Sequence, residues 1–369
     1  MPPPTVAVHA GQLLQPVPGG IGRYVRSLLR ALPGAGVEPL AFATGPRPAD
    51  VTGSWVALGP PRGPVRYELW HRFRRPAVRV PGEVVHATSL AVPPAGDRPL
   101  VVTVHDLVFL RQPEHLTRRG VAFHRRGLAL ARAEAAAVVV PTAWGRDDLL
   151  QEGFPPERVH VALHGVTVGE APTPEATRAV LAGLGIRHPF VLFASTIEPR
   201  KGAVDLVAAH AALRAARPDL DLQLVMAGPP GWGEPPDLDR PGVVVAGQVG
   251  DAMLEVLYRE ALALAHPARY EGFGMQVAEA MGRGCPVVTT DAACLPEVAG
   301  GAADLVPVGD VDALAAALLR LVEDTAHRAG RSTAGTARAA QLTWATSAAA
   351  HAGAYAAAVE VGPRVKARG

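Results

Sequence analysis

The chain has 369 residues, of which 49% are hydrophobic and 5% aromatic, and its formal net charge is +2. This length is long for one hydrophobic core and comfortable for two domains. The N-terminal segment lacks the features of a secretory signal, and no uncharged apolar run reaches the roughly 18 residues of a membrane span. Two cysteines make no disulfide framework. We therefore expect a protein that is cytoplasmic, either free or peripheral at the inner face of the membrane.

Charge is unevenly distributed along the chain. Residues 1–165 hold 19 Arg against 12 Asp and Glu, whereas the remainder holds 17 basic and 22 acidic residues. A basic first half favours an anionic partner. Of the 36 basic residues, all are Arg except Lys201 and Lys366. A lysine inside an arginine-rich chain indicates that Lys201 supplies a compact ammonium, although chance is the alternative.

Short apolar runs alternate with helical patterns throughout, which predicts parallel sheets covered by helices. In the first half the predicted strands are 6–9, 84–87, 100–105, 137–141 and 159–163. The predicted helices there are 23–32, opened by glycines 19–22, and 122–137. Residues 165–188 have a weaker pattern, interrupted by prolines, and are interpreted as an interdomain link with one short helix at 175–184.

The second half repeats the alternation. Its predicted strands are 190–194, 222–227, 243–246, 262–266 and 287–290. Its predicted helices are 204–216, 252–261, one directly after Gly274, 311–323 and about 346–359. Two doubly wound halves are therefore expected, with ligands beyond the carboxyl ends of the strands.

The segment from Ala265 to Glu297 is the most informative part of the chain. Two of its carboxylates, Glu271 and Glu279, have a Gly-Phe-Gly turn between them, and a helix of small residues follows the turn. Such a turn exposes backbone N–H groups that attract an anion. Ionised carboxylates accept hydrogen bonds from hydroxyls. The segment thus suits a phosphorylated ligand rich in hydroxyl groups.

Arg200 and Lys201 form a second candidate group, at a turn between a predicted strand and a helix. An arginine fork beside a lysine point charge can hold a pyrophosphate. The alternative is a solvated basic turn. The sequence alone leaves both readings open.

Gly19, Gly20 and His105 are the candidates in the first half. The glycines follow the first predicted strand and allow a close approach of backbone to a phosphate or sugar. His105 ends a strong apolar strand, where its imidazole can bond a sugar hydroxyl or a phosphate. A structural histidine bonded to the backbone is the alternative.

Two basic stretches, 66–79 and 118–132, carry apolar spacers. Tyr67, Trp70 and Phe73 are expected on one face of a short helix. These stretches suit an anionic membrane surface or a phosphorylated acceptor, with an exposed arginine-rich helix face as the alternative.

Several common motifs are missing. The chain has no G-x-G-x-x-G dinucleotide fingerprint, no Walker loop and no G-x-S-x-G nucleophile setting. No Cys/His cluster has the spacing of a zinc site. The aromatic and basic surface expected of a nucleic-acid binder is confined to the first half.

The order of motifs resembles glycosyltransferase family 4, whose members retain the configuration of the transferred sugar. The matching residues are Gly19-Gly20-Ile21-Gly22-Arg23-Tyr24, His105-Asp106-Leu107, Glu198-Pro199-Arg200-Lys201-Gly202, Gly228 with Gly231-Trp232, Glu271-Gly272-Phe273-Gly274, Glu279-Ala280-Met281 and Leu295-Pro296-Glu297-Val298. The resemblance implies a GT-B fold of class α/β, with two Rossmann-like domains facing a central cleft. The implied domains are 1–170 together with a crossover helix in 345–369, and 171–344.

The resemblance also implies roles for individual residues. Glu271 would bond the donor sugar, assisted by N–H groups of Phe273 and Gly274. Glu279 would bond the ribose, and Arg200 with Lys201 the diphosphate. The other residues expected at the nucleotide sugar are Gly19, Gly20, Thr196 and Met275, and His105 is expected to touch the sugar or the acceptor. Thr196 stands where many members carry Arg.

The implied activity is metal-independent transfer of a sugar, mannose above others, from a GDP- or UDP-linked donor. The acceptor would be a glycan, a lipid-linked sugar or a natural product, with no cofactor and no nucleic acid involved. Two alternatives remain at this point: a catalytically silent binding module of the same fold, and an NAD-dependent Rossmann oxidoreductase.

Overall fold

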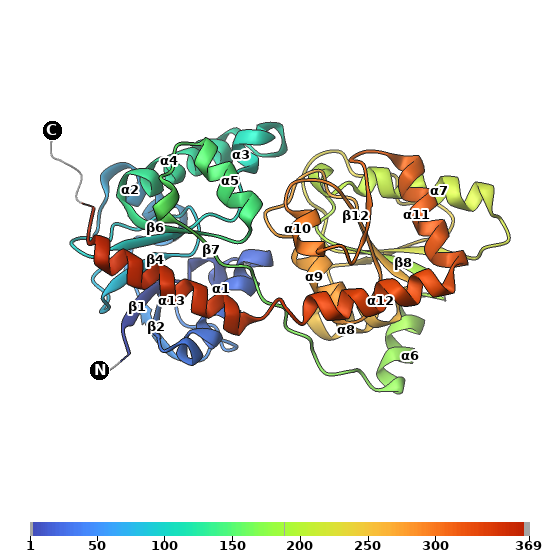
Figure 1. Cartoon of the computed structure of the whole chain (residues 1–369), viewed down its shortest axis with the longest axis horizontal. Coiled ribbons are helices and arrows are strands. Elements are labelled where there is room, and N and C mark those ends of the chain that lie inside the picture. Colours follow the sequence, from blue (N-terminus) through green and yellow to red (C-terminus); the bar gives the residue numbers. More distant parts are fainter. Residues whose placement is uncertain (1–2, 188, 365–369) are drawn as a thin grey trace. The chain divides into compact units, whose positions relative to one another are not determined.

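A computed structural model describes residues 3–187 and 189–364. The chain divides into two compact units, Met1–Gly165 with Thr343–Gly369, and Val166–Leu342. Each unit contains a parallel sheet covered by helices on both faces (Figure 1). Each therefore has the architecture expected from alternating apolar runs and helical patterns.

The first unit is built on a sheet of seven parallel strands in the order β3-β2-β1-β4-β5-β6-β7. The strands are β1 Thr5–His9, β2 Glu38–Ala43, β3 Ser54–Ala57, β4 Val84–Ala87, β5 Leu100–Thr103, β6 Ala135–Val140 and β7 Val159–Val161. Every residue of β4, β5 and β6 is buried. Burial on both faces explains why these strands read as continuous apolar runs.

The helices of the first unit bury two hydrophobic clusters against this sheet. They are α1 Gly19–Ala31, α2 Gly63–Phe73, α3 Val108–Arg111, α4 Arg118–Glu134, α5 Ala143–Gln151 and α13 Trp344–Val361. Short 3-10 helices lie at Gly11–Leu14, Leu32–Ala35, Pro113–His115 and Pro156–Arg158. Although α13 is last in the chain, it packs against α1 and β6 (Figure 1, red).

The second unit has six parallel strands in the order β10-β9-β8-β11-β12-β13. The strands are β8 Phe190–Ala194, β9 Gln223–Ala227, β10 Val243–Gly247, β11 Ala263–His266, β12 Val287–Thr290 and β13 Asp304–Val306. The helices are α6 Pro174–Gly183, η5 Pro199–Lys201, α7 Ala203–Ala216, α8 Asp251–Glu260, α9 Met275–Gly282, α10 Leu295–Ala299, α11 Val311–Glu323 and α12 Thr325–Ala339.

Some sequence expectations about elements were wrong. The first helix begins at Gly19 and not at Arg23, because Gly22 N–H already bonds Pro18 O at 3.0 Å. Tyr67, Trp70 and Phe73 do not share an environment: Trp70 is fully buried, whereas Phe73 is 63% exposed. Tyr67 and Phe73 are six residues apart, which is more than one and a half helical turns, so their rings point in different directions, and Phe73 is the last residue of α2.

A line of buried polar side chains joins α13 to the sheet of the first unit. Its members, in spatial order, are Tyr355, His86, Thr103, Tyr24 and His351. Neighbouring members lie 2.8–2.9 Å apart, and His351 Nδ1 donates to Ser347 O at 2.7 Å. Because burial keeps this ring neutral, its Nε2 accepts from the Tyr24 hydroxyl. Burial lowers the pKa of His351 to about 4, in keeping with that assignment.

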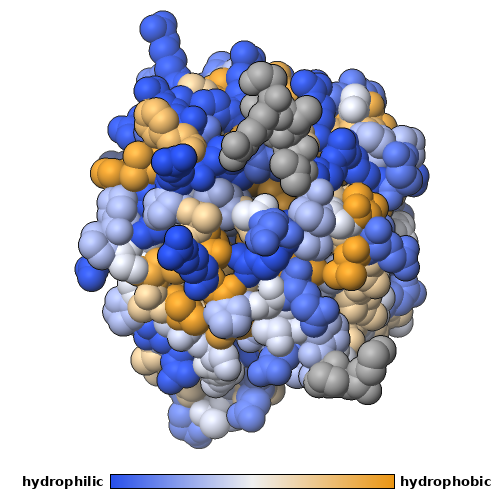
Figure 2. Space-filling model, turned by 90° about the vertical axis from the view of Figure 1, so that its left-hand side faces the viewer, coloured by the Kyte–Doolittle hydropathy of each residue, from blue (hydrophilic) through white to orange (hydrophobic). Residues whose placement is uncertain are grey.

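Hydrophilic side chains predominate on the face of the molecule shown in Figure 2, with apolar patches between them. No helix among the described residues is both long and apolar enough to cross a membrane.

Candidate functional site

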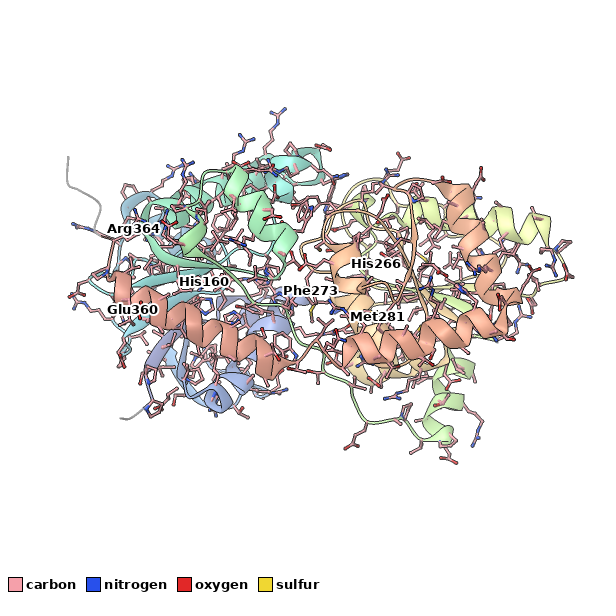
Figure 3. All side chains as sticks on the ribbon, in the orientation of Figure 1. His160, His266, Phe273, Met281, Glu360 and Arg364 are labelled. Carbon is pink, nitrogen blue, oxygen red and sulfur yellow. The ribbon has the colours of Figure 1, made fainter. Side chains whose placement is uncertain are left out.

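The centre of the candidate site is the turn between β11 and α9. Strand β11 ends at His266, and α9 begins at Met275 after Gly274, which has φ 81°. A Cβ at Gly274 would lie 2.7 Å from Leu295 Cδ2, so the position favours glycine on both counts. In Figure 3, His266 lies inside the second unit and Phe273 at the turn that leads into α9.

Glu271 and Lys201 form a buried ion pair in this turn. Each side chain is 7% exposed, and Lys201 Nζ donates to Glu271 Oε1. The fully buried His266 lies on the same oxygen, with its Nε2 at 3.0 Å. The second oxygen, Oε2, lies 3.4 Å from Arg200 Nη1. A carboxylate buried among donors of this kind stays ionised.

The titration behaviour of these groups follows from the same contacts. Burial alone would raise the pKa of Glu271, but Lys201, the His266 hydrogen bond and Arg200 together hold it well below its usual range. Burial, followed by the charge of Arg200, lowers the pKa of Lys201. Burial likewise lowers the pKa of His266, so this ring is neutral and donates Nε2–H to Glu271.

Besides its contact with Glu271, Arg200 is held by acceptors on Glu198 and Tyr270. Its Nε and Nη2 donate to Glu198 Oε1 at 3.1 and 2.8 Å, and its Nη1 donates to Tyr270 O at 3.1 Å. Because Glu198 and Tyr270 lie on either side of it, the guanidinium has a fixed position next to the Lys201–Glu271 pair.

The backbone of η5 brings Lys201 to that position. Gly202 follows the 3-10 helix with φ 69°, and a Cβ there would lie 1.9 Å from Pro267 O. Thr196 lies in the preceding loop, where Ile197 N–H donates to Pro229 O at 3.0 Å. A Cβ at Gly231 would lie 2.8 Å from Thr196 Cγ2. Glycines therefore allow the two loops to touch.

Glu279 is the second buried carboxylate of the segment, 4% exposed in α9. It accepts a hydrogen bond from Tyr258 Oη at 3.2 Å. Arg283 Nη1 donates to the backbone O of Glu279 at 2.9 Å, and its guanidinium lies 5.3 Å from the Tyr258 ring centre. These contacts hold the C-terminal half of α9 against Tyr258 of α8.

The predicted residues of the first unit have a different environment. Gly19 and Gly20 are exposed in the first turn of α1, and no atom lies within 4 Å of a Cβ placed on either. His105 donates Nε2–H to Thr88 O at 2.9 Å, and its ring packs edge-on against Tyr24. Burial lowers its pKa. The backbone bond leaves Nδ1 of His105 as the atom available to a ligand.

The structure thus brings most of the predicted set together within the second unit. Arg200, Lys201 and Glu271 are in direct contact, with Phe273, Gly274 and Met275 in the adjoining turn. Thr196 and Glu279 lie on the neighbouring loop and helix, whereas Gly19, Gly20 and His105 belong to the other unit. The proposed roles of all these residues stay predictions.

His266, Glu198 and Tyr258 are contacts that the sequence did not single out. His266 carried the same signal as His105, a histidine at the end of an apolar strand. Glu198 and Tyr258 carried no such signal, because their roles depend on contacts with residues distant in the sequence.

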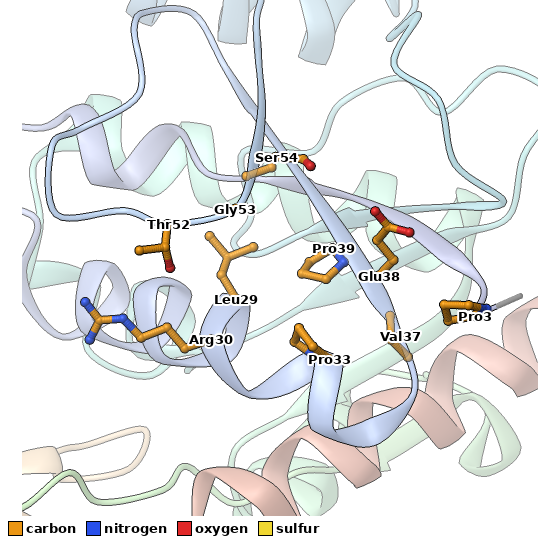
Figure 4. Close-up of a pocket in the computed structure, with 11 residues that line it drawn as sticks. Pro3, Leu29, Arg30, Pro33, Val37, Glu38, Pro39, Thr52, Gly53 and Ser54 are labelled. Carbon is orange, nitrogen blue, oxygen red and sulfur yellow. The ribbon is translucent and has the colours of Figure 1, made fainter.

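A hollow of about 490 Å³ lies elsewhere in the first unit, between α1 and the starts of β2 and β3 (Figure 4). Its lining includes Leu29, Pro33, Glu38 and Ser54, and none of the predicted site residues. In parallel sheets ligands bind at the carboxyl ends of strands, which is the opposite end. In the part of the chain that the structure describes, no group of three or more His, Cys, Asp or Glu could hold a metal ion.

Comparison with known proteins gives consistent matches for both units. Residues 18–170 match the family model described as "Glycosyltransferase Family 4", and residues 188–324 match "Glycosyl transferases group 1".

Two curated relatives and one solved structure illustrate the likeness. The chain is 27% identical to the O-antigen chain mannosyltransferase B of Escherichia coli, over 71% of each chain. It is 32% identical to the MMP alpha-(1->4)-mannosyltransferase of Mycolicibacterium hassiacum, over 61% of this chain and 57% of that protein. The structure of sucrose-phosphate synthase from Thermosynechococcus elongatus has a TM-score of 0.74 at 20% identity, and the match covers 96% of this chain and 98% of that one.

Proposed function

We propose that this chain, which belongs to glycosyltransferase family 4 and has the GT-B fold, transfers mannose from a GDP-linked donor with retention of configuration. The observation that carries the proposal is the buried Lys201–Glu271 pair at the turn before α9. Two relatives named as mannosyltransferases support mannose as the sugar.

Binding of the donor diphosphate is assigned to Lys201 and Arg200. An ammonium has three N–H donors, and Lys201 uses one of them on Glu271. Its remaining donors can bond phosphate oxygens without breaking the pair. Arg200 adds a second positive charge that Glu198 and Tyr270 already hold in place. Neutralising charge on the departing diphosphate stabilises the transition state, because the donors need no reorganisation.

Binding of the transferred sugar is assigned to Glu271. Its Oε1 accepts from Lys201 and His266, whereas within the described part of the chain Oε2 has only the long 3.4 Å contact with Arg200. Oε2 can therefore accept from a sugar hydroxyl. We assign the ribose hydroxyls to Glu279, whose Tyr258 contact orients the carboxylate at the other end of the first turn of α9.

The same contacts make Glu271 unsuitable as a nucleophile. A carboxylate stabilised by Lys201, His266 and Arg200, with its pKa held well below the usual range, is a weak base. A two-step route through a glycosyl-enzyme intermediate requires a reactive carboxylate. We therefore propose attack of the acceptor hydroxyl on the face that the diphosphate leaves, with a phosphate oxygen as the base.

The donor is tested by measuring nucleotide release from GDP-mannose, UDP-glucose and ADP-glucose, with and without EDTA. We expect turnover of GDP-mannose that EDTA does not reduce. Turnover of UDP-glucose alone contradicts the proposed donor, and loss of activity in EDTA contradicts the metal-independent reaction. Absence of both turnover and nucleotide binding for all three donors favours the catalytically silent module.

The stereochemistry of the transfer is tested separately from the donor. We propose a glycan, a lipid-linked sugar or a natural product as the acceptor. The configuration of the product made from GDP-mannose is read by NMR from the coupling at the anomeric carbon. An α-linked product agrees with retention, and a β-linked product contradicts it.

A further inference from the structure

A hollow lined by arginines lies on the first unit, and none of the residues assigned above lines it. It has a volume of about 610 Å³ and lies between the end of β3, helix α2 and the segment that follows α2. Its lining residues are Leu58, Gly59, Pro60, Arg66, Arg74, Arg75, Pro76, Ala77 and Arg79. Four of the nine are arginines, and none is acidic.

Arg66 is the innermost of these side chains, because it is only 4% exposed. Its Nε donates to Pro61 O at 2.9 Å and its Nη2 donates to Gly59 O, so both of these partners are neutral carbonyls. Its guanidinium carbon lies 5.6 Å from the centre of the Trp70 ring. Among the described residues no carboxylate pairs with Arg66, and its Nη1 has no hydrogen-bond partner. A buried cation without a counter-charge is costly, which is unusual for a purely structural residue.

The other three arginines of the hollow are likewise not paired with an acid that lines it. Arg74 donates to Glu134, which does not line the hollow, and to the carbonyl oxygens of Val92 and Pro93. Arg75 and Arg79 are exposed, and neither side chain has an ion pair or hydrogen bond within the described part of the chain. Arg66, Arg75 and Arg79 thus line one hollow, and no acidic side chain lines it to neutralise their charge.

The hollow is held in shape by its own backbone contacts. Trp70 is fully buried, and its Nε1 donates to Pro76 O at 3.2 Å. That bond ties the segment after α2 back onto the helix. Arg74 occupies the left-handed region with φ 52° and bonds Trp70 O at 2.8 Å. These hydrogen bonds hold in place the backbone that carries the arginines.

We propose that this hollow is a binding site for a phosphate group, separate from the proposed nucleotide-sugar site. Guanidinium forks match the geometry of phosphate oxygens and bond them with charge-assisted hydrogen bonds. A bound phosphate dianion supplies the counter-charge that Arg66, Arg75 and Arg79 lack. The phosphate belongs either to a lipid headgroup or to a freely diffusing phosphorylated molecule, and the chemistry of recognition is the same for both.

The site is tested by titrating inorganic phosphate into the protein by calorimetry, with excess GDP present to occupy the proposed donor site. The test variant is Arg75→Glu/Arg79→Glu, which changes two exposed side chains of the hollow. The matched control is Arg118→Glu/Arg119→Glu, which makes the same charge change at exposed positions of α4 outside the hollow.

We expect saturable binding of phosphate to the wild type and to the control variant. The test variant should bind at least tenfold more weakly, with an unchanged melting temperature. Equal binding by the wild type and both variants overturns the proposal, as does the absence of binding to the wild type.

A second arm distinguishes the two sources of phosphate. Vesicles of phosphatidylglycerol and phosphatidylcholine in equal parts are compared with vesicles of phosphatidylcholine alone in a sedimentation assay. If the wild type sediments with the anionic vesicles and the test variant does not, the hollow binds a lipid headgroup. If phosphate binds in solution but the two proteins sediment alike or not at all, the hollow binds a free phosphorylated molecule.

Discussion

Lys201 and Glu271 are one buried ion pair to which we assign a role in binding the donor. Both groups are buried, and each is the nearest opposite charge of the other. Removing one partner of such a pair leaves an uncompensated charge in the interior, which costs about 3–5 kcal/mol. Replacing both partners avoids that cost. The effect of Lys201 on the stability of the protein and its effect on GDP binding can therefore be measured separately.

The Lys201→Met substitution should destabilise the protein by about 3–5 kcal/mol and weaken GDP binding at least tenfold. The double variant Lys201→Met/Glu271→Gln should regain most of the stability and none of the GDP affinity. Chemical denaturation and calorimetry with GDP measure the two effects. Arg240→Met, which removes an exposed ion pair with Asp237, is the control and should change neither. Wild-type GDP affinity in Lys201→Met would contradict the assigned role.

His351 makes folding dependent on pH. Its pKa is about 4 in the folded protein, against 6.5 for an ordinary histidine. The unfolded chain therefore binds more protons between these values, so stability is complete above pH 6.5 and falls as the pH is lowered toward 4. For this one group the loss between pH 7 and pH 5 is about 2 kcal/mol.

Chemical denaturation at pH 7 and pH 5 measures that loss, with His351→Asn as the comparison. The variant removes the titrating ring from the line of polar side chains at α13, so its stability should fall less steeply with pH. Equal pH dependence of the two proteins would show that His351 is not neutral in the folded state.

At the scale of single residues, the sequence identified members of the Lys201–Glu271 cluster better than the contacts that join them. Arg200, Lys201 and Glu271 were identified by residue type and by their positions at predicted turns. No role was assigned to Glu198 or His266 from the sequence, although both bond members of this group. Their contribution depends on two loops meeting, which no local pattern encodes.

Among the elements, the turn before α9 depends most on the backbone conformation of a single residue, Gly274. The Gly274→Ala substitution would put a Cβ on a residue with φ 81°, close to Leu295. The left-handed conformation costs about 1–2 kcal/mol for a residue other than glycine. We expect a loss of about 1–3 kcal/mol of stability and weaker GDP binding, since the backbone of the turn must shift.

A matched control for this substitution is Gly330→Ala. Gly330 is exposed inside α12, and no atom lies within 4 Å of a Cβ placed there. Alanine inside a helix stabilises by about 0.5–1 kcal/mol relative to glycine. We therefore predict that Gly274→Ala lowers the free energy of unfolding and that Gly330→Ala raises it. A neutral Gly274→Ala would mean that the turn tolerates another conformation.

Element prediction was most reliable where both faces of an element are buried. The predicted bounds of β4 and β8 match the structure, and both strands are continuous apolar runs. Helix α12 was missed because Gly330, Gly335 and many small polar residues dilute its apolar pattern. Strand β2 was missed because Pro39 and exposed Glu38 at its start resemble a loop. In both cases tertiary packing outweighs local preference.

At the scale of the whole molecule, the two units have separate cores. The second unit, Val166–Leu342, is one continuous segment with its own cluster of buried apolar residues. The first unit is discontinuous, because it needs α13 from the end of the chain.

We therefore predict that residues 166–342 fold on their own. Expressed alone, this segment should unfold cooperatively and bind GDP, because the residues assigned to the diphosphate and the ribose all lie within it. Circular dichroism during heating and calorimetry with GDP check both points. A segment that folds but fails to bind GDP would place part of the nucleotide site in the other unit.

The most direct test of the central claim is a crystal structure of the protein with GDP. The account predicts the diphosphate within hydrogen-bond distance of Lys201 Nζ, with the ribose hydroxyls on Glu279 and the Lys201–Glu271 pair intact. A nucleotide bound away from the turn before α9, with neither Lys201 nor Glu279 in contact, would contradict it.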